Sequence, residues 1–186
     1  MLRNVRFSQI RARVAENANP LPHEVPAFPG ERRSCINLTG VPGYTIENVT
    51  FSGVHVTFPG GGTLEEAHAS VPELRDHYPE YHMFGQLPAY GMYVRHVKGL
   101  LLEDVRFDIQ NADLRPALVC EDVDDLELDG FRAEGNTEAD ALIVLRQARR
   151  VFIHGSRALK PVKAFVAATA SPDILLEGND LRLAGF

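Results

Sequence analysis

Leu102-Glu103-Asp104-Val105-Arg106-Phe107 is the stretch that decides the fold, because its pattern recurs along the chain. The pattern is an apolar residue, a polar residue, an Asn, Asp or Gly, and then a residue that is apolar in most copies. The other copies are Leu2-Arg3-Asn4-Val5, Ile46-Glu47-Asn48-Val49, Leu128-Asp129-Gly130-Phe131, Ile153-His154-Gly155-Ser156 and Leu176-Glu177-Gly178-Asn179. The last four copies begin 26, 25 and 23 residues apart. Self-similarity at such a period indicates a stacked repeat.

A second column of short strands is expected ahead of each copy, at 34–38, 90–94, 116–120, 140–144 and 163–167. Turn signals such as Pro42-Gly43 and Lys98-Gly99 follow these segments. The expected partner strands lie near 46–51, 101–107, 126–131, 151–155 and 174–177. Alternate residues of a strand share a face, which predicts an inward set of Ile36, Met92, Leu118, Leu142 and Phe165. The Asn, Asp and Gly residues of the repeat tolerate left-handed backbone, as a repeated corner requires.

One coil per 23 to 26 residues, with two or three short strands in each, predicts an all-β fold, a parallel β-helix of five to six coils. A leucine-rich repeat has an overlapping period, but the chain lacks its Leu-x-x-Leu-x-Leu-x-x-Asn string. Residues 1–186 form one predicted domain, interrupted by insertions at 15–33 and 59–89. Residues 1–14 correspond to the second half of a coil. We therefore expect either that the chain is cut from a longer protein or that another subunit covers that end.

Composition excludes several classes of function. The formal charge is −6 and the pI about 5.6, which gives no electrostatic support to nucleic-acid binding. No apolar run approaches the roughly 18 residues of a membrane helix, so no membrane role is expected. Cys35 and Cys120 are expected in the core and are not paired. The histidines lack the spacing of a zinc motif, so neither a metal nor a cofactor is predicted.

The two insertions enter at the same point of neighbouring coils and should lie on one side of the stack, which is often a binding face. Residues 15–33 contain four prolines and are expected to be irregular. In the second insertion, Thr63-Leu-Glu-Glu66 and Ser70-Val-Pro-Glu73 each match a capping box, which predicts two short helical turns.

The second insertion and the following strand carry a family resemblance. Tyr78-Pro-Glu-Tyr-His-Met-Phe-Gly85, Leu87-Pro-Ala-Tyr-Gly-Met-Tyr-Val94 and Asp113-Leu-Arg-Pro-Ala-Leu-Val-Cys120 resemble polygalacturonase-like proteins of glycoside hydrolase family 28. The resemblance covers nearly all of the chain, but only the C-terminal part of such an enzyme. It implies a right-handed parallel β-helix, an extracellular or periplasmic location, and hydrolysis of pectin-type polysaccharides with inversion.

The catalytic signature of that family is not found in register. It consists of Asn-Thr-Asp, Asp-Asp, Gly-His-Gly and Arg-Ile-Lys, in that order. Asn136-Thr137-Glu138, Asp124-Asp125 and Ile153-His154-Gly155 only imitate parts of it. The acidic cluster Glu121, Asp122, Asp124 and Asp125 is expected to be solvated surface. No catalytic residue is assigned, and the chain alone is expected to be inactive.

Candidate sugar-binding residues lie in and after the second insertion: Tyr78, Glu80, Tyr81, His82, Tyr90 and Arg95. Aromatic rings and an arginine could stack on sugars and pair with carboxylates. The alternative is that these aromatics pin the long loop onto the coils. Arg11 and Arg13 are outward candidates beside a possible groove, or simply a solvated strand edge.

A homo-oligomer interface is predicted on the outer face of the first strand column, at Tyr93, Val119, Ile143 and Val166. Exposed apolar ridges usually mark an interface, and a closed dimer or trimer is the expected assembly. Three functions therefore stay open. The chain is part of a glycosidase, a non-catalytic module that binds polysaccharide or oligosaccharide, or an assembly domain.

Overall fold

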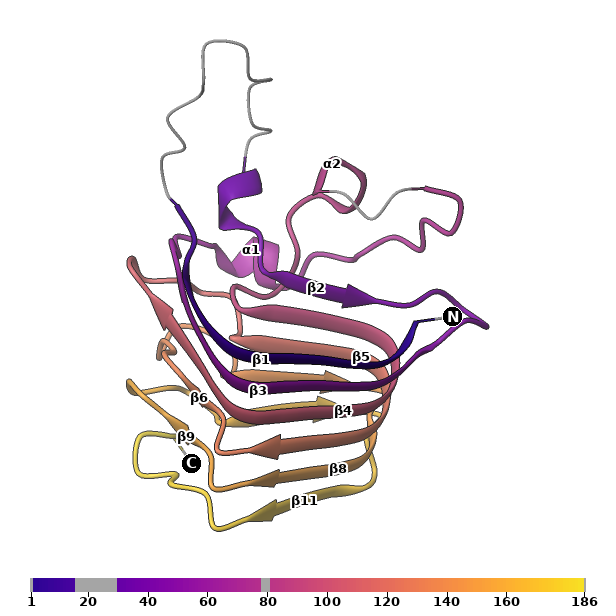
Figure 1. The fold of residues 1–186 in the computed structure, drawn as a ribbon. Helices are drawn as coiled ribbons and strands as arrows, with labels where there is room; N and C mark the ends of the chain where they lie inside the picture. The colour runs from indigo at the N-terminus through magenta and orange to yellow at the C-terminus, as the bar shows by residue number, and fades with distance from the viewer. Residues whose placement is uncertain (1, 16–29, 78–80, 186) are drawn as a thin grey trace.

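The computed structural model describes residues 2–15, 30–77 and 81–185. In these ranges the chain is all-β, with one large sheet whose named strand pairs are all parallel (Figure 1). Its strands are β1 (Arg3–Arg13), β2 (Ile36–Thr39), β3 (Ile46–Phe58), β4 (Met92–Ile109), β5 (Leu118–Asp129), β6 (Arg132–Ala133), β7 (Ile143–Arg146), β8 (Arg149–His154), β9 (Arg157–Ala158), β10 (Val166–Thr169) and β11 (Ile174–Glu177). Short helices are η1 (Glu31–Arg33), α1 (Leu64–Ala67) and α2 (Tyr81–Phe84).

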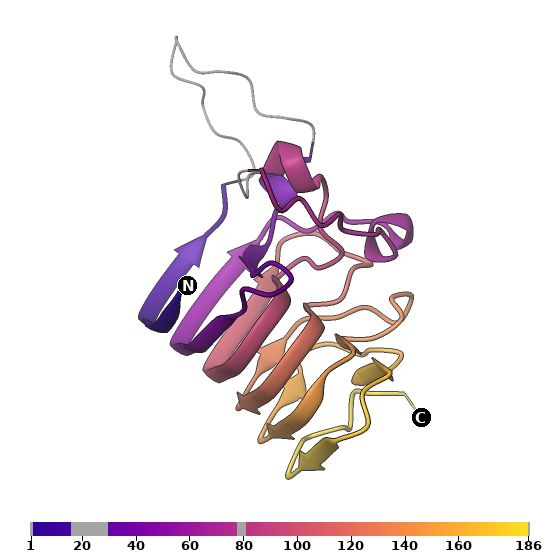
Figure 2. The same ribbon diagram turned by 90° about the vertical axis from the view of Figure 1, so that its right-hand side faces the viewer.

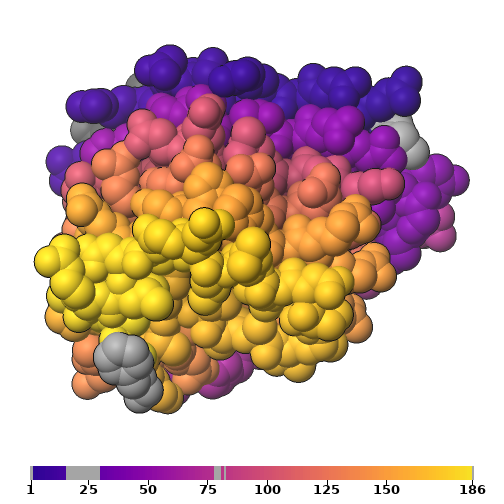
Figure 3. Space-filling model, turned by 90° about the horizontal axis from the view of Figure 1, so that it is seen from below, coloured from indigo at the N-terminus to yellow at the C-terminus, as the bar shows by residue number. Residues whose placement is uncertain are grey.

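Successive strands lie one above another in chain order. Pairing runs from β1 through β3 and β4 to β5, which pairs with both β7 and β8. Figure 2 shows the strands as consecutive rungs, and from below the surface is banded in chain order (Figure 3). The predicted first column begins two or three residues late, since β2, β7 and β10 start at Ile36, Ile143 and Val166. In β4 the two predicted strands are one continuous strand.

Residues with positive φ bend the strands, and they form three columns of positions that are aligned between neighbouring strands. One column is Asn4, Asn48, Gly99, Asp125 and Arg150; the next is Gln9, Gly53, Asp104, Gly130, Gly155 and Gly178; the third is His96, Asp122, Gln147 and Ala170. The use of Asn, Asp and Gly at corners is therefore confirmed. The predicted alignment of the first two copies is wrong, because Leu102 pairs with Phe51 rather than Ile46. Asn4 and Asn48 belong to the first column and Asp104 to the second. Both columns contain Asn, Asp or Gly, so the sequence pattern aligned residues from two different corners.

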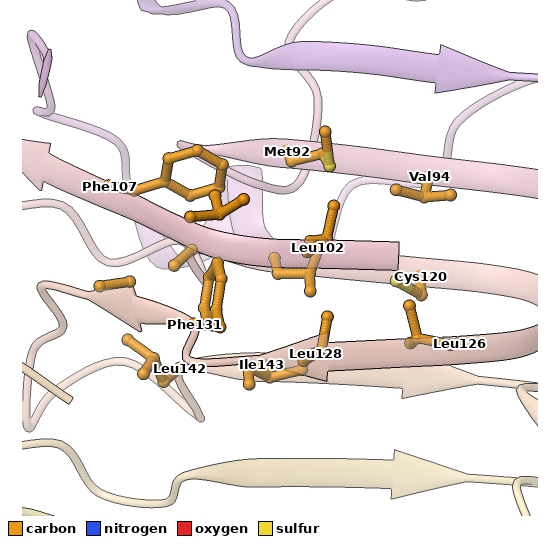
Figure 4. Packing of buried hydrophobic residues seen from close by; sticks show 14 of the residues in the cluster. Met92, Val94, Leu102, Phe107, Cys120, Leu126, Leu128, Phe131, Leu142 and Ile143 are labelled. Carbon is orange, nitrogen blue, oxygen red and sulfur yellow. The ribbon is translucent and has the colours of Figure 1, made fainter. Parts of the chain in front are cut away.

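The core lies inside the bent strands and is formed by alternate residues (Figure 4). Met92 pairs with Leu118 and Leu118 with Ile143, and all three side chains are buried. Phe107 contacts Phe58 and Phe131 edge to face, with ring centroids 5.5 and 5.6 Å apart. Cys35 and Cys120 are free, as expected. Burial raises the pKa of the Cys35 thiol to about 12.

The predicted interface residues are wrong as a surface. Ile143 and Val166 point inward. The register places Ile143 opposite Leu118, and Val166 opposite Ile143, whereas the prediction had Leu142 and Phe165 at these two positions. Tyr93 and Val119 do face outward, but both are fully buried. They pack in a second apolar cluster beneath the insertion, with Val71, Leu87 and Ala89, and Phe84 and Val144 at its edge. The insertion thus covers Tyr93 and Val119, and the predicted ridge is not an exposed surface.

One of the two predicted helical turns is present. Thr63 caps α1, and Thr63 and Glu66 exchange the two bonds of a capping box. Ser70 to Glu73 is not helical, so the second prediction is wrong. There, the Arg95 guanidinium donates to the carbonyls of Val71 and Pro72, which favours an extended path. The 15–33 insertion lies largely outside the described residues.

Candidate binding groove

An open groove follows the second column of corners, the one that contains Asp104 and Gly130. It consists of two adjoining hollows of about 420 and about 410 Å³, which share Asp104 and Arg132. The first is lined by Glu103, Asp104, Asp129, Gly130, Arg132, Gly155, Arg157, Gly178 and Asp180. The second is lined by Gln9, Ile10, Arg11, Gly53, His55, Asp104, Arg106 and Arg132. We call the whole feature the corner groove.

Glycine makes much of the groove floor. Gly53, Gly130, Gly155 and Gly178 all adopt positive φ between 57° and 68°. A Cβ added at Gly130 or Gly178 would meet no atom within 4 Å, so the space above the backbone is open. The corner requirement for left-handed backbone therefore also removes the side chains that would fill the groove.

One side of the groove is a row of basic residues, here named the basic flank. Strand register aligns its members in one column: Arg11, His55, Arg106, Arg132 and Arg157. Neighbouring strands of a sheet lie about 4.8 Å apart. Cationic groups therefore repeat along the groove at the spacing of the strands.

Acidic residues hold the middle of the basic flank in place. Arg106 Nε lies 2.9 Å from Asp108 Oδ1, and His55 Nε2 lies 2.5 Å from Asp108 Oδ2. Partial burial raises the pKa of Asp108, but hydrogen bonds and charge from His55 and Arg106 outweigh this effect and lower it. Arg132 forms an ion pair with Asp104 across the groove floor.

The two ends of the basic flank are open to a ligand. The side chains of Arg11 and Arg157 are exposed, and neither guanidinium forms a hydrogen bond or ion pair with any residue in the described ranges. The charge of Arg157 still acts locally, because it helps to lower the pKa of Asp180. Two guanidinium groups with free donors are therefore presented along one line.

The opposite side of the groove carries Glu103 and Asp129, which are aligned in register. Glu103 Oε2 accepts a hydrogen bond from Ser52 Oγ at 2.6 Å. Asp129 Oδ1 lies 3.5 Å from Nδ1 of His154, whose ring stacks on Phe152 with centroids 4.3 Å apart. Both flanks thus offer polar groups that are fixed by neighbouring side chains.

Two further carboxyl groups beside the groove, those of Asp108 and Asp180, have shifted pKa values. Where the fold shifts carboxyl pKa values beside the groove, at Asp108 and Asp180, it lowers them. For Asp180 the main cause is hydrogen bonding from Arg182. A catalytic acid needs the opposite shift, which burial or a like charge would cause. The described residues also contain no cluster of His, Cys, Asp and Glu that would hold a metal ion.

The predicted sugar-binding residues do not gather into this groove. Tyr90 is buried, and its hydroxyl donates to the Glu134 carbonyl; burial raises its pKa well above normal. Arg95 is also buried and holds the insertion, as described above. These two assignments are wrong, because Tyr90 is buried in the main core and Arg95 is buried beneath the insertion. Tyr81 lies elsewhere, with its hydroxyl 3.4 Å from Gln86 Oε1. Tyr78, Glu80 and the His82 side chain lie outside the described residues.

Arg11 does line a groove, as one reading of the sequence expected, whereas Arg13 donates to Gln110 Oε1 at 2.7 Å. The other members of the basic flank were missed, since at least 25 residues separate each from the next. A signal was present: Arg106, Arg132 and Arg157 each stand two residues after the corner residue of their repeat.

The acidic cluster is used in ion pairs away from the groove. Glu121 pairs with Arg146 and accepts from the Tyr93 hydroxyl at 2.6 Å. Asp124 Oδ2 lies 2.9 Å from Arg150 Nη2. These side chains are therefore occupied by partners outside the corner groove, which we take as the candidate site.

None of the helices in the described ranges has both the length and the apolar character needed to cross a membrane. Comparison with protein-family models, curated proteins and solved structures finds no match to this chain.

Proposed function

We propose that the chain is a right-handed parallel β-helix of five to six coils that binds a polysaccharide along the corner groove without hydrolysing it. Parallel pairing of successive strands and three columns of repeated corners support the fold. The observation that carries the function is the basic flank, one column of four arginines and a histidine parallel to the strand stack. A linear polymer is the ligand whose form matches a linear array.

Guanidinium groups suit this ligand because they donate paired hydrogen bonds to hydroxyl and carboxylate oxygens. The floor of glycine backbone lets a chain of sugars approach closely, and the acidic side accepts hydrogen bonds from sugar hydroxyls. The resemblance to family 28 favours a pectic polysaccharide and an extracellular or periplasmic location.

Absence of hydrolysis is part of the proposal. The family's catalytic strings are missing in register, and the shifted carboxyl groups beside the groove are held ionised. If this sequence is part of a longer hydrolase, the corner groove would form one wall of its cleft. Binding without hydrolysis is expected of these 186 residues in either case.

Calorimetric titration with oligogalacturonides tests the proposal. The variant Arg132→Gln/Arg157→Gln should weaken binding by about tenfold or more, since it removes two charge-assisted contacts. Arg149→Gln is the matched control, because Arg149 is exposed on β8 and does not line the groove. Equal affinity of wild type and the double variant would reject the groove. Release of reducing ends from polygalacturonate by the wild type would reject the absence of catalysis.

A further inference from the structure

A short segment of the second insertion, Val71 to Glu73, crosses the outer face of β4 and is here called the strap. Arg95 Nη1 donates to the Val71 carbonyl at 2.8 Å, and Nη2 donates to the Pro72 carbonyl at 3.0 Å. Arg95 Nη1 also lies 3.2 Å from Glu73 Oε1. The strap is therefore attached to β4 by one buried guanidinium, which contacts all three of its residues.

His96 is the second attachment. Its Nε2 lies 2.9 Å from Glu73 Oε1 on the strap, and its Nδ1 lies 2.7 Å from Asp122 Oδ2 on β5. The ring cannot easily turn away, because His96 occupies a corner at φ 53° and its side chain is only 13% exposed. One imidazole thus connects the strap to two neighbouring strands.

Both ring contacts are hydrogen bonds only when the imidazole is protonated. An ionised carboxylate only accepts, and a neutral imidazole has one N–H and one lone pair. Deprotonation therefore leaves either Glu73 or Asp122 facing a lone pair of the ring, without the hydrogen bond that it accepted from His96. Asp122 belongs to β5, which pairs with β4 on one side and with β7 and β8 on the other, whereas residues 71–73 belong to no strand, so the loss should loosen the strap.

One cation still pairs with Glu73 after that loss, because Arg95 Nη1 lies 3.2 Å from Glu73 Oε1, so the strap is loosened and not released. The charged groups that face the ring are Glu73 from the strap, Asp122 from β5 and the adjacent Arg95. Gly40, which follows β2, packs backbone against His96 and adds no charge. Gln147, the next residue in the corner column after Asp122, is also neutral.

Beneath the strap lies the second apolar cluster. Val71 packs there with the buried side chains of Tyr93 and Val119. Loosening the strap would therefore uncover apolar side chains on an otherwise closed face.

We propose that the strap is a pH-sensitive cover, closed while His96 is an imidazolium and loosened when His96 loses its proton. Falling pH favours the protonated ring, so closure is favoured as pH falls and loosening as pH rises. Arg95 keeps the strap attached throughout, so the change is a local opening rather than unfolding.

Hydrogen exchange of backbone amides tests this, with rates corrected for the intrinsic effect of pH. Between about pH 5.5 and 8, protection of a peptide that covers 71–77 should fall about threefold to tenfold, the range for one partly exposed charge-assisted bond. Protection of a core peptide that covers 100–109 should not change. In His96→Gln the pH dependence at 71–77 should disappear.

His154→Gln is the matched control, since His154 also lies between two carboxylates, Glu127 at 3.0 Å and Asp129 at 3.5 Å, but does not touch the strap. It should keep the wild-type pH dependence at 71–77. If the core peptide 100–109 loses protection in His96→Gln, the variant Glu73→Gln is used instead. Glu73→Gln should also abolish the pH dependence of protection at 71–77. A flat wild-type profile, or an unchanged profile in the His96 or Glu73 variant, overturns the proposal.

Discussion

Asp113 and Arg115 form a salt bridge closed to solvent, with Arg115 Nη2 2.8 Å from Asp113 Oδ2 and exposed side-chain fractions of 0% and 1%. The pair ties together both ends of the second insertion. Asp113 Oδ2 accepts from the Gly62 N–H at 2.9 Å, and Arg115 Nη1 donates to the carbonyls of Arg33 and Leu87. A buried ion pair is therefore the anchor of the loop that covers the outer face of β4 and β5.

Asp113→Asn should lower the free energy of unfolding by about 3–5 kcal/mol, because it leaves the Arg115 charge buried without its counter-ion. Urea unfolding followed by circular dichroism measures the loss. Glu138→Gln is the control, since Glu138 is exposed and its side chain has no hydrogen bond or ion pair in the described ranges. A loss below about 1 kcal/mol for Asp113→Asn would show that the pair is not the anchor.

Ala170→Gly should stabilise the protein by up to about 1 kcal/mol, although glycine usually weakens β structure. Ala170 sits at φ 51° in the third corner column, and left-handed backbone costs a residue with a Cβ about 1–2 kcal/mol. Part of this gain is lost to the greater freedom of glycine in the unfolded chain.

Ala168→Gly provides the comparison, because Ala168 is also exposed and lies two residues earlier, within β10. That change should destabilise by about 0.5–1 kcal/mol. Thermal unfolding of the two variants should give shifts of opposite sign. Shifts of the same sign would mean that the corner is not strained.

Much of this fold was predictable because its signals are local and repeated. The period, the parallel all-β character and the left-handed corners follow from the residues that recur about every 25 positions. The register was not predictable to one residue. Leu142 and Ile143 are both apolar and both lie in the core, so hydrophobicity alone does not tell which one pairs with Leu118.

The candidate site was less predictable for a different reason. The corner groove combines side chains from successive repeats, and only strand register brings Arg106, Arg132 and Arg157 into one line. Tyr90 and Arg95 were misread because residue types suited to sugars also suit buried positions. Tyr90 is buried in the main core, and Arg95 is buried by an insertion whose path the sequence pattern does not define.

Stability at low pH should depend on Asp108. Hydrogen bonds and charge from His55 and Arg106 lower its folded pKa despite partial burial. A lowered folded pKa adds stability that is complete above the unfolded value and is lost as pH falls through the folded value. The stability contributed by Asp108 should therefore begin to fall at about pH 4 and should decrease further at lower pH.

Asp108→Asn should flatten this part of the stability curve, since asparagine does not titrate. Urea unfolding at several pH values between about 5 and 2.5 compares the slopes. Glu103→Gln serves as the comparison within the same groove, and it should leave the Asp108 contribution in place. Identical slopes for wild type and Asp108→Asn would contradict the role given to Asp108.

Ile143→Asp should unfold the protein rather than change its oligomeric state. Ile143 is fully buried and pairs with Leu118 inside the core (Figure 4), so an aspartate there would be a charge without a partner. The expected loss exceeds about 4 kcal/mol, a size reserved for buried charges and large cavities. Ile143→Val, which only shortens the side chain, should cost about 0.5–1.5 kcal/mol and leave the fold intact. Circular dichroism together with size-exclusion chromatography distinguishes the outcomes. A folded, soluble Ile143→Asp protein with an altered assembly state would return this residue to the surface and contradict the register of β7.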